Sequence, residues 1–174
     1  MNPETILEVL ILDFRLQGYD RAVFSLILQK INTITMKIKT GIGIDIHRLE
    51  PGLDFWLGGI KLEHEKGCVA HSDGDVLIHA ICDALLGAAG LDDIGVYFPD
   101  TDPAYKGIDS KILLKKVIDM IEDKGFAIGN IDCVVCLQRP KIKMRTLEMR
   151  ECLSEIMGID VDNHQGYHDG ETGL

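Results

Sequence analysis

Residues 71–79 of this chain read His-Ser-Asp-Gly-Asp-Val-Leu-Ile-His, and this stretch decides how the fold is interpreted. Short polar side chains that cap helices come directly before an apolar run, which is typical of a helix start. We therefore predict a helix from about Asp75 to Ala89, with Ser72 or Asp73 as its cap. Gly90 is expected to end it, because glycine readily adopts the left-handed conformation that follows many helices.

Outward from this helix, strands and helices alternate along the chain. Residues 36–47 alternate in polarity and predict a first strand, and residues 55–62 predict a hairpin with a glycine turn. A second helix is expected to begin at Ser110 and end at Gly125, with an apolar stripe of Ile112, Leu113, Val117, Ile118 and Ile121. A strand over 130–137 and a helix over 144–157, ended by Gly158, follow. Such alternation predicts an α/β domain.

The composition excludes several classes of protein. A chain of 174 residues with 46% hydrophobic content is long enough for one domain with a core. The net charge of −10 argues against a nucleic-acid partner, because a surface that binds phosphate backbones is basic. The five scattered cysteines are typical of reduced thiols in a cytosolic protein. No export signal is evident and the apolar run at 6–14 is too short for a membrane span of roughly 20 residues, so we expect a cytoplasmic protein without a membrane partner.

Two cysteines, Cys133 and Cys136, have the spacing of a redox or zinc motif. They lie in the strand expected over 130–137, where side chains three positions apart point to opposite faces. We therefore interpret them as small apolar fillers.

Asp45, His47 and His79 form a candidate metal site. Asp45 and His47 are two residues apart, so they point to one side if their segment is a strand, and His79 lies in the predicted helix. One oxygen and two nitrogen ligands suit zinc, which with three protein ligands keeps a fourth position open. Each residue alone is more simply interpreted as an exposed carboxylate or a hydrogen-bonded histidine, and only the combination favours a metal.

Three further segments each have a functional and a plain interpretation. His71 and Ser72 lie at the expected helix N-terminus, where they either bind a phosphoryl group or simply cap the helix. The acidic loop 93–102 either clamps the hydroxyls of a polyol, supports a second cation with oxygen ligands, or is a solvated turn. Four cations gather within residues 139–145, where they either contact a phosphate or lie in solvent.

Five segments occur in an order that resembles a known family, the 2-C-methyl-D-erythritol 2,4-cyclodiphosphate synthases. They are Asp-Ile-His at 45–47, the stretch 71–79, Asp-Ala-Leu-Leu-Gly-Ala at 83–88, Asp-Ile-Gly at 93–95 and Phe-Pro-Asp-Thr-Asp at 98–102. The likeness runs from Met36 to about Asp162. It implies an α+β fold with a small mixed β-sheet, helices packed on one face of that sheet, and a surface that forms trimers.

The resemblance implies an enzyme of the non-mevalonate isoprenoid pathway, a metal-dependent phosphorus–oxygen lyase. Its substrate would be 4-diphosphocytidyl-2-C-methyl-D-erythritol 2-phosphate, whose 2-phosphate attacks the β-phosphorus of the cytidine diphosphate arm. The reaction releases CMP and forms 2-C-methyl-D-erythritol 2,4-cyclodiphosphate. No protein nucleophile is needed, so catalysis is expected to rest on positioning and charge neutralisation. The implied assembly is a homotrimer with active sites between subunits.

The resemblance also assigns residues by motif. Asp45, His47 and His79 match the zinc ligands, and His71 matches a catalytic group that stabilises the transition state. Asp45, His47, His71 and Ser72 are expected to contact the substrate. The erythritol and phosphate contacts would come from Asp93, Ile94, Gly95, Phe98, Pro99, Asp100, Thr101 and Asp102. The cytidine segment, which would serve a neighbouring subunit, would comprise Leu137, Gln138, Arg139, Pro140, Lys141, Ile142 and Lys143.

The chain departs from the family at both ends. Residues 1–35 are expected to be an extension from a start codon chosen in error, or else a genuine N-terminal arm. Beyond Gly158 the family continues with a last strand, whose glutamate binds a second metal, Mg²⁺ or Mn²⁺, and a last helix. Residues 163–174 lack that motif, so we expect the strand, the helix and the glutamate to be missing, as a frame-shifted gene would produce. The synthase domain would then span 36–162.

The leading interpretation is therefore the synthase. The alternative is a catalytically impaired, non-enzymatic product of a truncated or frame-shifted gene, and release of CMP from the substrate separates the two. A generic zinc hydrolase is disfavoured, because no general base is evident beside the open coordination position.

Overall fold

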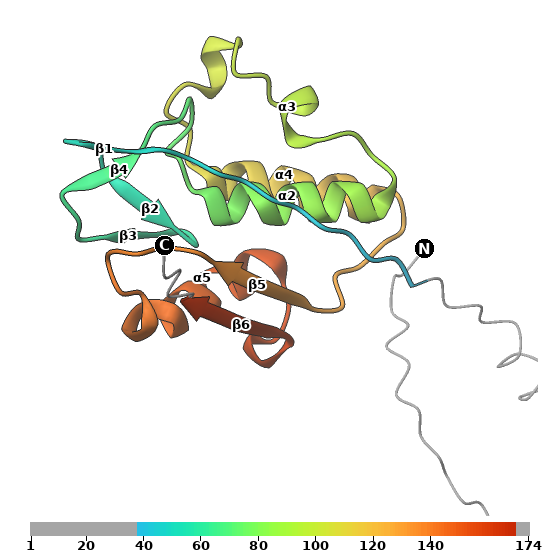
Figure 1. The fold of residues 1–174 in the computed structure, drawn as a ribbon. Coiled ribbons are helices and arrows are strands. Elements are labelled where there is room, and N and C mark those ends of the chain that lie inside the picture. The colour runs from blue at the N-terminus through green and yellow to red at the C-terminus, as the bar shows by residue number, and fades with distance from the viewer. Residues whose placement is uncertain (1–37, 170–174) are drawn as a thin grey trace, which may run out of the picture. The chain divides into compact units, whose positions relative to one another are not determined.

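The computed structural model describes residues 38–169, with side chains up to Asp162, and a compact unit begins at Lys39. Its helices are α2 (Val76–Ala89), α3 (Ile94–Tyr97), α4 (Ser110–Asp123) and α5 (Thr146–Met157), and its strands are β1 (Leu49–Pro51), β2 (Phe55–Leu57), β3 (Ile60–Leu62), β4 (Lys66–Cys68), β5 (Ile131–Val135) and β6 (His164–Asp169). Within this part of the chain, β1 pairs with β4 and β2 with β3, both antiparallel, and β5 pairs with β6 in parallel. Figure 1 shows this mixture of small sheets and helices, and the predicted α/β class is confirmed.

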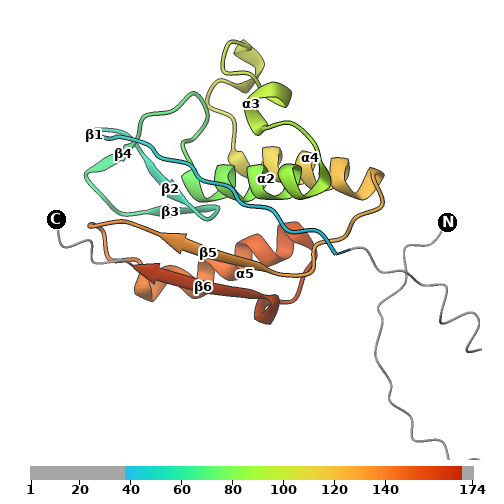
Figure 2. The same cartoon turned by 45° about the vertical axis from the view of Figure 1, so that its right-hand side comes forward.

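The segment before β1 differs from its prediction. A strand was expected over 36–47, but residues 39–48 run along α2 as an extended segment without a strand partner (Figures 1 and 2). The first strand begins only at Leu49. The β-structure of the described residues is consequently divided among three two-stranded pairs rather than gathered in one sheet.

The alternation that suggested a strand has another cause in the structure. Gly41 and Gly43 lie directly against the backbone of α2, where a side chain on either would overlap the carbonyl groups of Ala84 and Ala80. The Ile44 side chain points away from α2 and is 73% exposed. The two glycines thus let the segment lie close to α2, and the isoleucines form its outer face.

The start of α2 is capped by Asp75 rather than by Ser72 or Asp73. The Asp75 carboxylate accepts the Ile78 N–H at 3.1 Å and is completely buried. It also accepts two N–H groups from the turn of the β2–β3 hairpin, Gly58 at 2.9 Å and Gly59 at 2.7 Å. One side chain therefore caps the helix and holds the hairpin against it. The far end of α2 is as predicted, with Gly90 in the left-handed conformation.

Helix α4 begins at Ser110 as predicted, with the Asp109 carboxylate as its cap. Gly125 follows its last turn with a φ of 79°, also as predicted. Its apolar stripe is correct except at Ile112, which is 49% exposed, and Leu114 is buried instead. The helix is rotated slightly from the predicted orientation because Leu114 packs into the core cluster.

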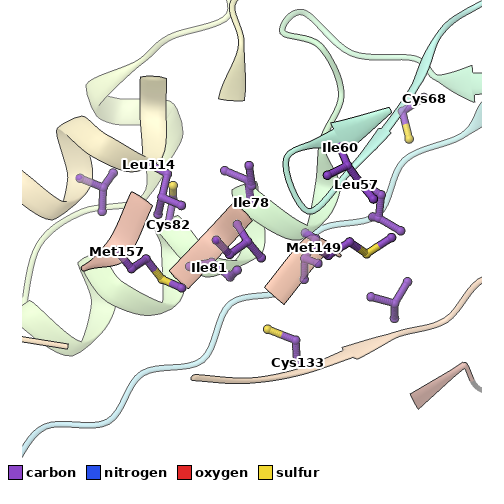
Figure 3. Packing of buried hydrophobic residues seen from close by; sticks show 14 of the residues in the cluster. Leu57, Ile60, Cys68, Ile78, Ile81, Cys82, Leu114, Cys133, Met149 and Met157 are labelled. Carbon is purple, nitrogen blue, oxygen red and sulfur yellow. The ribbon is translucent and has the colours of Figure 1, made fainter. Parts of the chain in front are cut away.

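Helix α5 ends at Gly158 as predicted, but its expected first turn is a short 3₁₀ turn at Lys143–Arg145. Its buried face joins the main core, which Figure 3 shows from close by. There Met149 of α5, Ile78 of α2 and Leu57 of β2 belong to one buried cluster. No helix among the described residues is long and apolar enough to cross a membrane.

The final strand is present, contrary to the expectation that it would be missing. The backbone of His164–Asp169 forms β6 beside β5, with a register irregularity between Asp132 and Cys133. Strand pairing uses main-chain N–H and C=O groups, so it does not require the family's side-chain motif. The expected loss of a final helix concerns positions outside the described residues.

Candidate functional site

Asp45, His47 and His79 lie together as the spacing predicted. Their candidate ligand atoms are within 4.8 Å of one another. Asp45 Oδ2 is 3.0 Å from Nδ1 of His79, and Asp45 Oδ1 is 3.2 Å from Nδ1 of His47. The extended segment supplies the first two residues and the first turn of α2 supplies the third. The carboxylate lies between two imidazole nitrogens in a half-buried position.

The charges around Asp45 favour its ionised form. Burial opposes ionisation and is the largest single influence on this carboxyl group. The hydrogen bond to His79 and the charges of both imidazoles together outweigh burial, so the pKa of Asp45 is below its usual value. The site therefore presents a fixed negative charge beside two nitrogen donors.

The Nδ1 atom of His47 supports a cation site. It is buried and has no hydrogen-bond partner, although Asp45 Oδ1 is only 3.2 Å away. The distance is short, but the direction is wrong for a hydrogen bond. A buried imidazole nitrogen without a hydrogen-bond partner, beside a carboxylate oxygen, is suited to bind an ion.

A cavity of about 320 Å³ opens beside this cluster. It is lined by His47, His71, Ser72 and His79 together with Ile94, Phe98 and Asp100 from the acidic loop. The candidate metal ligands and the candidate phosphate-binding residues therefore face one space.

His71 and Ser72 make contacts that a simple helix cap would not. Nε2 of His71 is 3.2 Å from the carbonyl oxygen of Asp102, and the His71 carbonyl accepts the Gly107 N–H at 2.7 Å. Ser72 Oγ is 3.0 Å from Nε2 of His79. The stretch 71–72 thus links the acidic loop to the metal cluster.

The segment 93–102 is more ordered than the loop that was predicted. Asp93 caps the single-turn helix α3, accepting the N–H groups of Gly95 and Val96 at 2.9 and 3.2 Å. Asp83 of α2 accepts the Ile94 N–H at 2.8 Å. These bonds attach the segment to α2 and place Ile94 at the cavity wall. Pro99 and Thr101 belong to the same segment but do not line this cavity.

Residues 137–143 lie elsewhere. None of them lines the 320 Å³ cavity of its own chain. Ile142 is 1% exposed and belongs to the core, so its side chain is unsuited to contact a substrate. Arg139 and Pro140 are joined by a cis peptide bond. Cys133 is buried and Cys136 exposed, in line with the opposite faces predicted.

Several residues near the site were not predicted. Tyr105 lines the cavity, and its ring meets Phe98 edge-on at 5.5 Å while Lys116 lies over both rings. Asp73 and Ser110 approach His79 through hydrogen bonds. Ser110 is 31 positions from His79, and sequence spacing reveals neighbours only within one helix or strand, so the sequence held no signal for this contact.

Comparisons with known proteins agree with this site. The model of the YgbB family matches residues 38–165. A 2-C-methyl-D-erythritol 2,4-cyclodiphosphate synthase of Bacteroides fragilis is 59% identical over 128 residues, covering 74% of this chain and 80% of that protein. One from Cytophaga hutchinsonii is 54% identical over the same share. A solved structure of such a synthase in a CDP-bound form has a TM-score of 0.74 and 38% identity, covering 78% of this chain and 91% of that one.

Proposed function

Because the chain belongs to the YgbB family, we propose that it is a cyclodiphosphate synthase that acts in the isoprenoid pathway. It converts 4-diphosphocytidyl-2-C-methyl-D-erythritol 2-phosphate to 2-C-methyl-D-erythritol 2,4-cyclodiphosphate and releases CMP. The observation that carries this proposal is the shared cavity, which brings His47 and His79 of the metal cluster beside His71 and Ser72. The relatives named above support it, and the alternative of an inactive gene product is not favoured by them.

We propose that Asp45, His47 and His79 hold Zn²⁺. One ligand atom from each of the three residues lies within 4.8 Å of the others, and a carboxylate with two imidazoles is a donor set that zinc accepts. When bound, the ion would polarise a phosphoryl oxygen and neutralise part of its charge. A second site for Mg²⁺ or Mn²⁺ stays a prediction.

His71 is proposed to stabilise the transition state. The Asp102 carbonyl oxygen near its Nε2 can only accept a hydrogen bond, so Nε2 carries the proton. An N–H donor in this position can transfer its hydrogen bond to a phosphoryl oxygen as negative charge develops there. Ser72, next to it, is proposed to contact the same phosphate.

The substrate itself supplies the nucleophile in this reaction, and the cysteines fit that arrangement. Burial is the main cause that raises the pKa of Cys68 to about 11 and that of Cys133 to about 12. Burial also raises the pKa of Cys82. A thiol with a raised pKa is a poor nucleophile, because the thiolate is the reactive form. Catalysis by positioning and charge neutralisation is therefore the simpler account.

The remaining contacts and the assembly are proposed in the same way. Residues 93–102 would hold the erythritol and phosphate groups, supported by Ile94, Phe98 and Asp100 at the cavity wall. Residues 137–143, apart from the buried side chain of Ile142, would bind cytidine for a neighbouring subunit of a homotrimer. That none of them lines the cavity of its own chain supports this division. The free thiols support a cytoplasmic location.

The test is conversion of the substrate by the purified chain with zinc and either magnesium or manganese, followed by ³¹P NMR and by assay of CMP. We expect the cyclic diphosphate and CMP in equal amounts. His71→Ala should reduce kcat by about 10²–10³-fold, as loss of one transition-state donor does. His64→Gln is the matched control, because His64 does not line the cavity and contacts only the nearby Lys66 backbone and the Phe55 ring. Unchanged substrate with a folded chain would overturn the proposal.

A further inference from the structure

The second nitrogen of His79 has partners that the proposed reaction does not use. Nε2 is 3.0 Å from Ser72 Oγ and 3.1 Å from Ser110 Oγ. The Ser110 hydroxyl in turn is 2.5 Å from Asp73 Oδ1. Ser110 is completely buried at the start of α4. This chain of contacts runs from a carboxylate through a hydroxyl to a candidate metal ligand.

The hydrogen positions in this chain follow from the chemistry of its members. A carboxylate only accepts hydrogen bonds, so the single hydroxyl hydrogen of Ser110 points at Asp73. The Ser110 oxygen is then left with lone pairs toward His79, so it can accept a hydrogen bond from Nε2 of His79. Nδ1 of His79 faces Asp45 at 3.0 Å and donates to that carboxylate, and a cation bound at Nδ1 would leave the ring proton on Nε2, where Ser110 accepts it.

Asp73 is itself held firmly. Its Oδ2 accepts the backbone N–H of Ser110 at 2.9 Å, and its Oδ1 accepts the N–H of Asp75 at 3.1 Å. The carboxylate thereby joins the start of α4 to the start of α2. The orientation of the Ser110 hydroxyl is fixed by two helix ends rather than by one mobile side chain.

We propose that Asp73 and Ser110 are positioning residues that orient the His79 ring and accept its Nε2 proton when Nδ1 binds a metal. This inference rests on the metal site of the proposed function. Outer hydrogen bonds of this kind fix ring orientation and raise ligand basicity, and losing one typically weakens metal binding by about 10–100-fold.

The two residues differ in the effect expected on removal. In Asp73→Asn an amide NH₂ can face Ser110 and reverse its hydroxyl, which would then point at Nε2 and oppose the proton that Nε2 carries when Nδ1 binds a metal. In Ser110→Ala the imidazole still has Ser72 as a partner. We therefore expect zinc affinity to fall about 100-fold in Asp73→Asn and about 10-fold in Ser110→Ala.

The experiment is competition for zinc between the full chain and a chromogenic chelator, with no substrate present. Ser154→Ala is the matched control for Ser110→Ala, because Ser154 is also buried and its hydroxyl has no hydrogen-bond partner. Thermal melting in excess chelator separates a loss of metal binding from a loss of stability. If Ser110 has a positioning role, the metal-free melting temperature of Ser110→Ala stays close to that of Ser154→Ala.

The outcomes separate the two proposals. A parent that binds zinc tightly, with Asp73→Asn and Ser110→Ala weakened in that order and Ser154→Ala unchanged, supports the inference. If the parent binds zinc and both variants stay within about twofold of it, the inference is overturned while the metal site stands. If the folded parent binds no zinc, the metal site is overturned and the inference with it. Ser110→Ala alone decides the matter if Asp73→Asn does not fold.

Discussion

The candidate metal site joins two regions that are built in opposite ways. At the junction of α2 with the β2–β3 hairpin, one buried carboxylate, Asp75, accepts three backbone N–H groups and fixes the turn of helix that carries His79. The segment 39–48, which carries Asp45 and His47, has no strand partner and exposes Ile42, Ile44 and Ile46. One of the three candidate ligands is therefore preorganised by the core, and the other two depend on close packing against α2 and on the site itself.

Breaking the junction should have the largest effect. Asp75→Ala leaves three buried N–H groups without an acceptor, and we expect unfolding free energy to fall by about 4–5 kcal/mol. Asp109→Ala is the control, because Asp109 caps α4 through the Lys111 N–H alone, and it should lose only about 1 kcal/mol. Urea unfolding measures both. If both variants lost the same free energy of unfolding, the hydrogen bonds from the hairpin turn to Asp75 would add nothing to its role as a helix cap.

Removing the metal should come next. An ion that binds only the folded chain stabilises it by about 2.7 kcal/mol at a concentration 100 times its Kd. Thermal melting with added zinc and with excess chelator should therefore differ by several degrees, and Asp45→Asn should abolish that difference. If the melting temperature did not change with zinc, the segment 39–48 would be held against α2 without a metal ion.

A smaller effect is expected from filling the contact between the segment and α2. In Gly43→Ala the new methyl group would overlap the Ala80 carbonyl, so the segment must move outward. We expect a loss of about 1–3 kcal/mol, as for other overpacked sites, together with weaker zinc binding. Gly87→Ala is the matched control, since Gly87 lies in α2 with open space around it, and alanine there should stabilise by about 0.5–1 kcal/mol. If Gly43→Ala bound zinc as tightly as the parent, the close packing of the segment 39–48 against α2 would be contradicted.

The smallest effect concerns the thiol of Cys68, whose pKa is raised in part by a carboxylate from each region. Burial is the main reason that its pKa is raised to about 11, and the charges of Asp75 and Asp45 add to it. Because the thiolate is the reactive form, alkylation of Cys68 should accelerate as pH rises toward this pKa. Asp45→Asn should lower the pKa slightly and shift the rate profile to lower pH. Mass spectrometry of alkylated peptides would report this, with the exposed Cys136 as an internal reference. Overlapping profiles for Cys68 and Cys136 would contradict the raised pKa.

The sequence predicted the parts of the fold that depend on local signals. The glycines at 90, 125 and 158 mark helix ends because a left-handed residue follows each helix, and all three have positive φ. The hairpin at 55–62 and the grouping of Asp45, His47 and His79 were also predicted, since each depends on short spacings or on the recognised motifs. Local pattern and motif were sufficient there.

The rest depended on contacts between distant positions. Asp75 caps α2 because it also meets the hairpin turn, and nothing near residues 72–75 distinguishes it from the other candidate caps. The segment 39–48 alternates because glycines face α2, a pattern that a strand would share. Ser110 was predicted only as a helix start, although the fold brings it to His79.

The contact between Asp45 and His79 joins positions that are 34 residues apart. The loop between them contains β1 to β4. An ion bound to both ends of this loop would cross-link them, and closing a loop of this size removes roughly 3–4 kcal/mol of chain entropy from the unfolded state. A chain that took up an ion while it folded would therefore have fewer conformations to search in this region, and the ion would guide folding as well as serve the proposed reaction.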